Sequence, residues 1–194
     1  VKKSFQRAGI QTLAGVKIES AVASPENVTL KVNDAGTVTT MTADWLLISA
    51  GVIPNTSGLG LETVGVTLDK RGMVSTDDHM ATNVPGIYAI GDITGKLALA
   101  HVASAQGVIA AESIAANLGL YKGRINRLDY NAMPRCTYTV PQVASMGLTE
   151  AQAREQGYAV KVSKFPLSAN GKSLALNNRD GFVKIVADAK YGEI

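Results

Sequence analysis

Gly91 and Asp92 form a pair that could bind a ligand. The Asp92 carboxylate can accept hydrogen bonds from hydroxyl groups, and bonds to a charged acceptor are stronger than neutral ones. Gly91 has no Cβ, so a ligand can approach its backbone closely. The pair therefore suits a small molecule with several hydroxyl groups. A Gly-Asp pair alone is more often only a turn that ends a strand, so its flanking elements decide between the two interpretations.

The residues before this pair predict a strand. Residues 87–90 read Ile-Tyr-Ala-Ile, an apolar run bounded by Pro85-Gly86 on one side and Gly91-Asp92 on the other. Such a run is typical of a buried strand of the parallel type. Open α/β sheets bind ligands at the carboxyl ends of their strands, which is where Gly91 and Asp92 would lie.

The residues after the pair predict a helix over 97–117, because Ala98, Val102, Ala105 and Ile109 recur at helical spacing. Its first turn comes shortly after Asp92, so its free N–H groups and positive dipole end can face the same ligand. We therefore expect a ligand that carries hydroxyl groups and a part that becomes anionic.

The string from Thr82 to Asp92, T-x-x-P-G-I-Y-A-I-G-D, resembles the second FAD fingerprint of the pyridine nucleotide–disulfide oxidoreductases. The resemblance implies that Asp92, which follows Gly91, binds the ribityl chain of FAD. The triplet Leu99-Ala100-His101 and the segment that follows are similar to the dihydrolipoamide dehydrogenase branch of this family. There the resemblance implies a backbone contact from the alanine near the flavin ring, with the leucine and the histidine on either side.

For His101, a hydrogen-bonded structural role is the favoured alternative to proton transfer.

A second motif, from Gly51 to Thr56, follows an apolar strand predicted over residues 44–50. It resembles the family's G-R-x-P-N-T, in which the glycine lies at the NAD site. Here Val52 replaces the arginine, which leaves a backbone role for Gly51. A plain turn at the end of a strand fits Gly51 equally well.

Composition excludes several classes of function. The chain has 194 residues, of which 46% are hydrophobic and 18% charged, enough to form a packed core. Its net charge of +3 comes from dispersed basic residues without interleaved aromatics, so we expect no nucleic-acid partner. No apolar run approaches the length of a membrane span, and we expect no membrane partner and a cytoplasmic location.

The chain contains a single cysteine, Cys136, so it can form no internal disulfide and no C-x-x-C pair. The family that the chain resembles usually has an apolar residue at this position, so we expect this cysteine to pack in a core.

His79 stands beside two adjacent aspartates, which are too few ligands for a metal, and we predict no metal site.

The first 50 residues predict a helix that ends at Gly9, followed by three strands over 16–22, 28–32 and 37–41 with a hairpin turn at 33–36. After a linker at 119–124, the chain predicts short strands within 133–148. A capping box at Thr149 opens a helix over 150–156, and strands follow over 158–165 and 181–188. This last part resembles the family's interface (dimerisation) domain, which implies a homodimer.

The predicted fold class is α/β: a fragment of the two-dinucleotide-domain flavoprotein disulfide reductase fold plus the start of an α+β interface domain. We expect residues 1–50 to be the C-terminal part of an NAD-binding domain. Residues 51–124 would be the C-terminal part of an FAD-binding domain, and residues 125–194 the N-terminal part of the dimerisation domain.

The resemblance implies a flavoprotein that oxidises protein-bound dihydrolipoamide with FAD and NAD, and a lipoyl-bearing acyltransferase of a 2-oxoacid dehydrogenase complex as partner. The chain has no G-x-G-x-x-G after a strand, no cysteine pair and no histidine after His101. We therefore expect a piece of a longer protein that has no catalytic residue and is inactive alone. A related mercuric or glutathione reductase, or a non-catalytic dimerisation module, are the alternatives.

Overall fold

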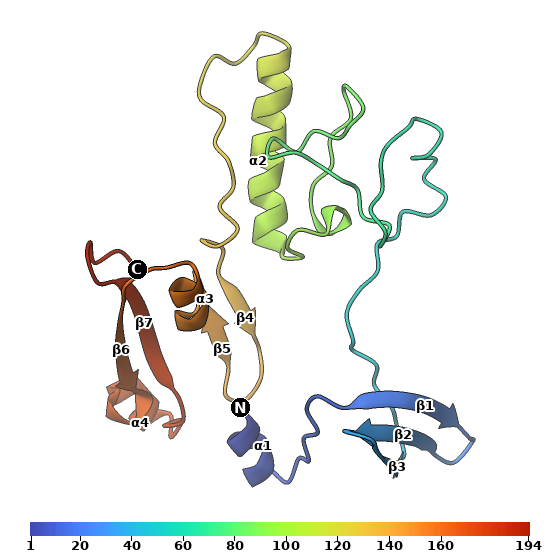
Figure 1. The fold of residues 1–194 in the computed structure, drawn as a ribbon, viewed down its shortest axis with the longest axis vertical. Helices are drawn as coiled ribbons and strands as arrows, with labels where there is room; N and C mark the ends of the chain where they lie inside the picture. Colours follow the sequence, from blue (N-terminus) through green and yellow to red (C-terminus); the bar gives the residue numbers. More distant parts are fainter. The chain divides into compact units, whose positions relative to one another are not determined.

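The computed structural model describes all 194 residues and divides them into two compact units. Unit 1 comprises Val1–Gly51 with Tyr138–Gln142, and unit 2 comprises Val52–Thr137 with Val143–Ile194. Figure 1 shows the elements of both units in chain order. None of the helices combines the length and the apolar character that crossing a bilayer requires.

Unit 1 consists of a short helix and an antiparallel sheet. Helix α1 (Lys2–Arg7) ends as predicted, with Gly9 in the left-handed conformation at φ 76°. The sheet has the order β1-β2-β3, formed by Lys17–Ala23, Val28–Asp34 and Thr37–Ala43 (blue in Figure 1). All three predicted strands are confirmed.

The predicted hairpin turn between β2 and β3 is also confirmed. Ala35 and Gly36 both take positive φ, 48° and 96°, as a tight hairpin turn requires. The side-chain oxygen of Asn33 accepts a hydrogen bond from the Gly36 amide at 2.8 Å. The turn is thus held by a local side chain, which explains why four residues sufficed to predict it.

Two predicted strands are absent. Residues 44–50 follow β3 without pairing to any strand, and Trp45 and Leu47 are 90% and 89% exposed. Residues 87–90 make only an isolated bridge between Tyr88 and Ala81. An apolar run becomes a strand only where a neighbouring strand takes up its backbone hydrogen bonds, and no strand of this chain does so here. Both strand predictions are therefore wrong for this structure.

Unit 2 is organised around α2 (Ala100–Asn117), which the sequence predicted three residues longer at its start. Its buried residues, Val102, Gln106, Ile109, Ala110 and Ser113, form one stripe along the helix. The fully buried Met80 packs with Ile109 and Ala110. The other elements of this unit are η1 (Asp92–Thr94), β4 (Arg135–Thr137), β5 (Val143–Ser145), α3 (Glu150–Glu155), β6 (Val160–Pro166), η2 (Leu167–Ala169), α4 (Gly171–Ala175) and β7 (Phe182–Asp188).

The C-terminal elements follow the local signals. In the predicted capping box, the Gln152 amide donates to Thr149 Oγ1 at 3.3 Å and the Thr149 amide donates to Gln152 Oε1 at 2.9 Å. Strands β6 and β7 pair antiparallel from Val160–Asp188 to Pro166–Phe182. Strands β4 and β5 form a separate antiparallel ribbon.

Cys136 lies in the middle of β4 and is exposed. The prediction that it packs in a core is therefore wrong. The reason is that all six residues of the β4–β5 ribbon are exposed, so no second layer covers the ribbon in this chain.

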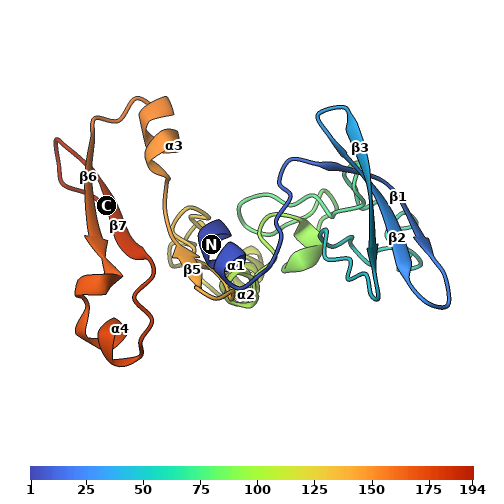
Figure 2. The same cartoon turned by 90° about the horizontal axis from the view of Figure 1, so that it is seen from below.

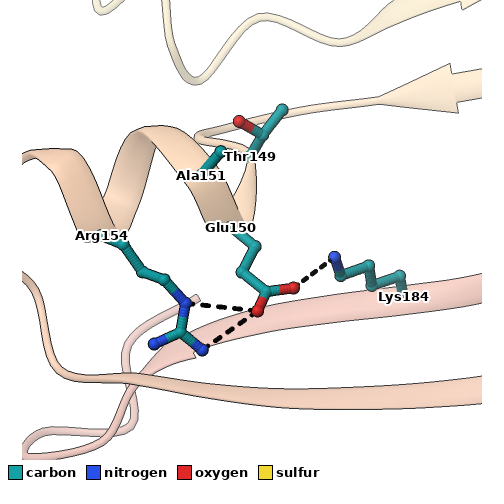
Figure 3. Close-up of a pocket in the computed structure, with 5 residues that line it drawn as sticks. All are labelled: Thr149, Glu150, Ala151, Arg154 and Lys184. Atoms are coloured by element: carbon teal, nitrogen blue, oxygen red, sulfur yellow. Dashed lines mark hydrogen bonds and ion pairs between the residues drawn. The ribbon is translucent and has the colours of Figure 1, made fainter.

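A charged cluster joins α3 to β7, as Figure 3 shows. Lys184 Nζ lies 2.7 Å from Glu150 Oε2, and Arg154 Nη2 lies 3.0 Å from Glu150 Oε1. The hydrogen bond from Lys184, followed by that from Arg154, holds the pKa of Glu150 below its usual value of 4.5. The carboxylate therefore binds the helix to the hairpin most strongly when it is ionised.

This cluster predicts a pH dependence. Because the pKa of Glu150 is lower in the folded than in the unfolded state, its stabilisation is complete above pH 4.5 and is lost as the pH falls through the folded pKa. Glu150→Gln should lower the thermal midpoint at pH 7, and its difference from wild type should shrink between pH 5 and pH 3, as measured by circular dichroism at about half-unit steps.

Glu155→Gln is the matched control, since Glu155 is an exposed carboxylate on the same helix that makes no ion pair. If the thermal midpoints of wild type and Glu150→Gln differ by the same amount from pH 5 to pH 3, the charge of Glu150 contributes nothing to stability.

Candidate functional site

The Gly91-Asp92 pair lies in a loop whose backbone is fixed from both sides of Gly91. The Gly91 amide donates to Gln106 Oε1 at 2.6 Å. Its carbonyl accepts from the Thr94 amide at 3.0 Å and from Thr94 Oγ1 at 2.8 Å. The conformation of Gly91, φ 78° and ψ −157°, belongs to a region that is essentially restricted to glycine. The glycine is thus required for its backbone angles.

The string before Gly91 forms a self-contained turn. The Thr82 hydroxyl donates to the Ile87 carbonyl at 2.9 Å and accepts from the Val84 amide at 3.1 Å. The Thr82 amide also donates to the Ile87 carbonyl, at 3.0 Å, and Gly86 takes φ 84°. The threonine and the glycine of this string therefore shape a turn that precedes Gly91.

Asp92 begins η1, and its carboxylate is exposed and makes no hydrogen bond within the chain. An ionised carboxylate offers about four acceptor positions, all of which are available here. The backbone of Asp92 is held in place, because its carbonyl accepts from the Gly95 amide at 3.0 Å. A fixed backbone with a free carboxylate suits a ligand that presents hydroxyl groups.

The far side of η1 is clamped by residues 73 and 74. The Val74 amide donates to the Ile93 carbonyl at 2.9 Å. Gly95 has φ 64°, and a Cβ at this position would lie 2.7 Å from Met73 Cγ. The turn that carries Met73 is held by Asp69, whose pKa is lowered chiefly by the hydrogen bond from the Met73 amide. The loop is therefore packed against a turn that is held by hydrogen bonds to Asp69.

The start of α2 lies next to Gly91. A Cβ on Gly91 would meet the Cβ of Ala103 at 3.5 Å, so the first turns of α2 pack on this glycine. Figures 1 and 2 both show the short green turn η1 beside the end of α2 at which the helix begins. The amides of Ala100 and His101 have no partner within the chain, as expected for a helix start without a side-chain cap. They can donate to a ligand.

Of the predicted site residues, Gly91, Asp92, Leu99, Ala100 and His101 all belong to this loop and helix start. Leu99 is extended (φ −140°, ψ 137°) and precedes the helix. The His101 Nε2 lies 3.1 Å from the Pro134 carbonyl oxygen, which gives the ring a structural partner. Gly51 lies apart from them in sequence, at the end of unit 1, exposed and with φ 126°. Its role stays a prediction.

The sequence analysis did not identify Gln106, which holds the loop, or Tyr130, which binds Gln106. Gln106 is fully buried, and its Nε2 donates to the Tyr130 hydroxyl at 2.9 Å. The signal was present: Gln106 lies four residues after Val102 and three before Ile109, so it is a polar residue within an apolar stripe. A polar side chain at such a position must find buried partners.

A concave region lies beside α3, and it is a structural cluster. Thr149, Glu150, Ala151, Arg154 and Lys184 line it (Figure 3). The Glu150 carboxylate is bound by both cations, and no group of three or more His, Cys, Asp or Glu side chains in the chain could hold a metal. The Gly91-Asp92 loop is therefore the better candidate for ligand binding.

Residues 1–107 match the pyridine nucleotide-disulphide oxidoreductase family, and residues 133–194 match the dimerisation domain of that family. The chain belongs to this family. Both the predicted family and the predicted fold class are confirmed. Membership implies the use of a flavin and a pyridine nucleotide, and the free carboxylate and helix amides at the Gly91-Asp92 loop fit a polyhydroxylated flavin cofactor.

Relatives with high identity carry the name dihydrolipoyl dehydrogenase. The chain is 50% identical over 194 residues to that of Mycobacterium leprae, covering 100% of this chain and 40% of the relative. It is 44% identical over 198 residues to that of Corynebacterium glutamicum, covering 100% and 41%. The chain thus spans about 40% of the length of the relatives that it matches.

Solved structures agree on the fold. LpdA from Mycobacterium tuberculosis is 29% identical, with a TM-score of 0.83 over 98% of this chain and 39% of LpdA. The HOCl-induced flavoprotein disulfide reductase RclA from Escherichia coli is 25% identical, with a TM-score of 0.79 over 97% of this chain and 41% of RclA. The chain therefore has the fold of a part of the flavoprotein disulfide reductases.

The backbone of Gly91 makes a prediction about stability. Gly91→Ala should lower the free energy of unfolding by about 1–3 kcal/mol, because alanine is strained at these backbone angles. Steric conflict is not the cause, since the new methyl would make an ordinary contact with Ala103. Urea unfolding measures the effect.

Gly107→Ala is the matched control. Its Cβ would also meet a side-chain carbon at 3.5 Å, that of Ile90, but Gly107 lies inside α2 with ordinary helical angles. Alanine should stabilise a helix interior by about 0.5–1 kcal/mol relative to glycine. The two substitutions have equal steric demand, but they should change the free energy of unfolding in opposite directions. A change in the same direction would refute the strain at Gly91.

Proposed function

We propose that this chain forms the flavin-facing part of a dihydrolipoyl dehydrogenase. In its full length, that protein would oxidise protein-bound dihydrolipoamide to lipoamide and reduce NAD⁺ to NADH with release of a proton. The single observation that carries the proposal is the free Asp92 carboxylate on a backbone that Gln106 holds against the start of α2. Identity of 50% to a dihydrolipoyl dehydrogenase over the whole chain supports this assignment.

The residues of the loop would share the binding of FAD. The Asp92 carboxylate would accept hydrogen bonds from the ribityl hydroxyls. The Ala100 amide would donate near the flavin ring, between Leu99 and His101. The positive end of the α2 dipole would favour negative charge in that part of the ring. FAD, when bound, supplies two-electron transfer between a dithiol–disulfide pair and a nicotinamide.

The remaining parts of the chain receive roles by the same proposal. Residues 1–50 would close the NAD-binding domain, and Gly51 would present its backbone to NAD. Residues 51–124 would close the FAD-binding domain. Residues 125–194 would open the dimerisation domain, through which two copies form a homodimer. A lipoyl-bearing acyltransferase of a 2-oxoacid dehydrogenase complex would deliver the substrate.

Other disulfide reductases remain as alternatives, because RclA, named as a flavoprotein disulfide reductase, shares the fold. Steady-state reduction of NAD⁺ with dihydrolipoamide, set against reduction of glutathione disulfide or Hg²⁺ with a reduced nicotinamide, decides between them. A homodimer that binds no flavin would identify a non-catalytic dimerisation module instead.

Removing the carboxylate tests the role of Asp92. In the full-length protein, Asp92→Ala should weaken FAD binding by roughly tenfold to a hundredfold, because bonds to a charged acceptor contribute about 1.5–3 kcal/mol. Flavin fluorescence during titration of the apoprotein gives the dissociation constant. Glu155→Ala, which removes an exposed carboxylate from α3, should leave it unchanged. Equal affinity of wild type and Asp92→Ala would refute the assignment of the site.

The isolated chain provides a second test. We expect the 194-residue polypeptide to retain no stoichiometric FAD and to show no dihydrolipoamide oxidation, because its single cysteine cannot form a redox disulfide and it has no G-x-G-x-x-G loop for a pyrophosphate. Absorbance near 450 nm after gel filtration and NADH formation are the measurements. A bound flavin at one per chain would contradict this expectation.

A further inference from the structure

Gln106 is buried in a way that calls for a specific role. Its side chain is 0% exposed, and only Met80 and Val102 are comparably large and buried. Burial of an amide is unfavourable unless its polar atoms are hydrogen bonded. Both ends of this amide have partners, Gly91 at 2.6 Å and Tyr130 at 2.9 Å. A backbone N–H can only donate, so the side-chain oxygen must face Gly91 and the NH₂ group must face Tyr130.

The two partners come from distant parts of the chain, 15 residues before Gln106 and 24 residues after it. Tyr130 is itself anchored, because Lys96 Nζ lies 5.7 Å from its ring centroid and Arg135 Nη2 donates to its carbonyl at 3.5 Å. Arg135 begins β4, within the part that matches the dimerisation domain. The amide thus connects the ligand loop with the segment that leads into that domain.

We propose that Gln106 is a positioning residue for the flavin, which acts by fixing the Gly91 peptide and thereby the direction of the Asp92 carboxylate. Through Tyr130, the same amide couples this loop to the entry of the dimerisation domain. The proposal rests on the function proposed above. It adds that the affinity for FAD depends on two residues that need not touch the cofactor.

The Gly91 amide determines how a substitution of Gln106 changes the affinity for FAD. Without an acceptor it would remain unpaired in a partly buried position, and the loop would rotate to satisfy it elsewhere. In the full-length protein, Gln106→Leu removes both hydrogen bonds, and the dissociation constant for FAD should rise roughly tenfold or more. Burial favours the neutral form of a carboxyl group. A neutral Gln106→Glu side chain keeps an acceptor for the Gly91 amide and a donor for the Tyr130 hydroxyl, so its dissociation constant should stay within about threefold of wild type.

Tyr130→Phe isolates the second hydrogen bond. It leaves the Gly91 contact in place and should raise the dissociation constant by about threefold to fivefold, less than Gln106→Leu does. Ser113→Ala is the matched control, because Ser113 is a buried polar residue of the same helix, 4% exposed, whose hydroxyl donates to Ile109 at 2.7 Å within that helix. It should leave FAD affinity unchanged even where the thermal midpoint falls.

The measurements are flavin fluorescence titration, for the dissociation constant, and the shape of the flavin absorption band, which reports the environment of the ring. Rescue by Gln106→Glu but not by Gln106→Leu, with Ser113→Ala unaffected, supports the proposal. Wild-type affinity in Gln106→Leu, or equal weakening in Gln106→Leu and Gln106→Glu, overturns it, as does an equal loss in Ser113→Ala. If Gln106→Leu fails to fold, wild-type affinity in Tyr130→Phe overturns it and the predicted rise supports it.

Asp92→Ala separates this proposal from the function on which it rests. Weakened FAD binding in Asp92→Ala, together with wild-type affinity in Gln106→Leu, leaves the flavin site standing and removes only the positioning role. A full-length protein that binds no FAD at all overturns both.

Discussion

The hydrogen bond between the Gly91 amide and the buried Gln106 oxygen is the contact on which the geometry of the candidate site depends. In an open α/β sheet, the pairing of strands would fix the residues at a strand end. No strand precedes Gly91 here, so its position comes from local contacts: Gln106 on α2, Thr94 within η1 and the packing of Gly95 on Met73. These contacts fix the backbone of the loop, and they leave the Asp92 carboxylate free to bind a ligand.

The residues that carried the family resemblance have a physical explanation in this loop. Thr82 closes a turn with its hydroxyl, Gly86 takes positive φ within it, and Gly91 adopts angles that other residues avoid. The string thus specifies a backbone path that ends in one exposed carboxylate. This is why a short sequence could identify the family, although the strand that the same residues predicted is not formed.

Elements with local causes could be predicted from the sequence. Three features depend on residues that are at most four positions apart in the sequence. They are the capping box at Thr149, the hairpin turn held by Asn33 and the apolar stripe of α2. Residues 44–50 and Cys136 could not be placed in this way, because a strand or a core position requires neighbours that a pattern does not supply. For Gln106, the sequence could predict its position in the apolar stripe. It could not predict its two hydrogen-bond partners, which are 15 and 24 residues away.

The exposed stretch after β3 gives the chain an intrinsic optical probe. Trp45 is its single tryptophan, and with 90% of its surface in water its indole should emit at the long wavelengths of a solvated ring. Any segment that docks along residues 44–50 and covers this ring would shift the emission to shorter wavelength. Assembly of this stretch with a neighbour can therefore be followed without a label, and the signal arises from one identified position.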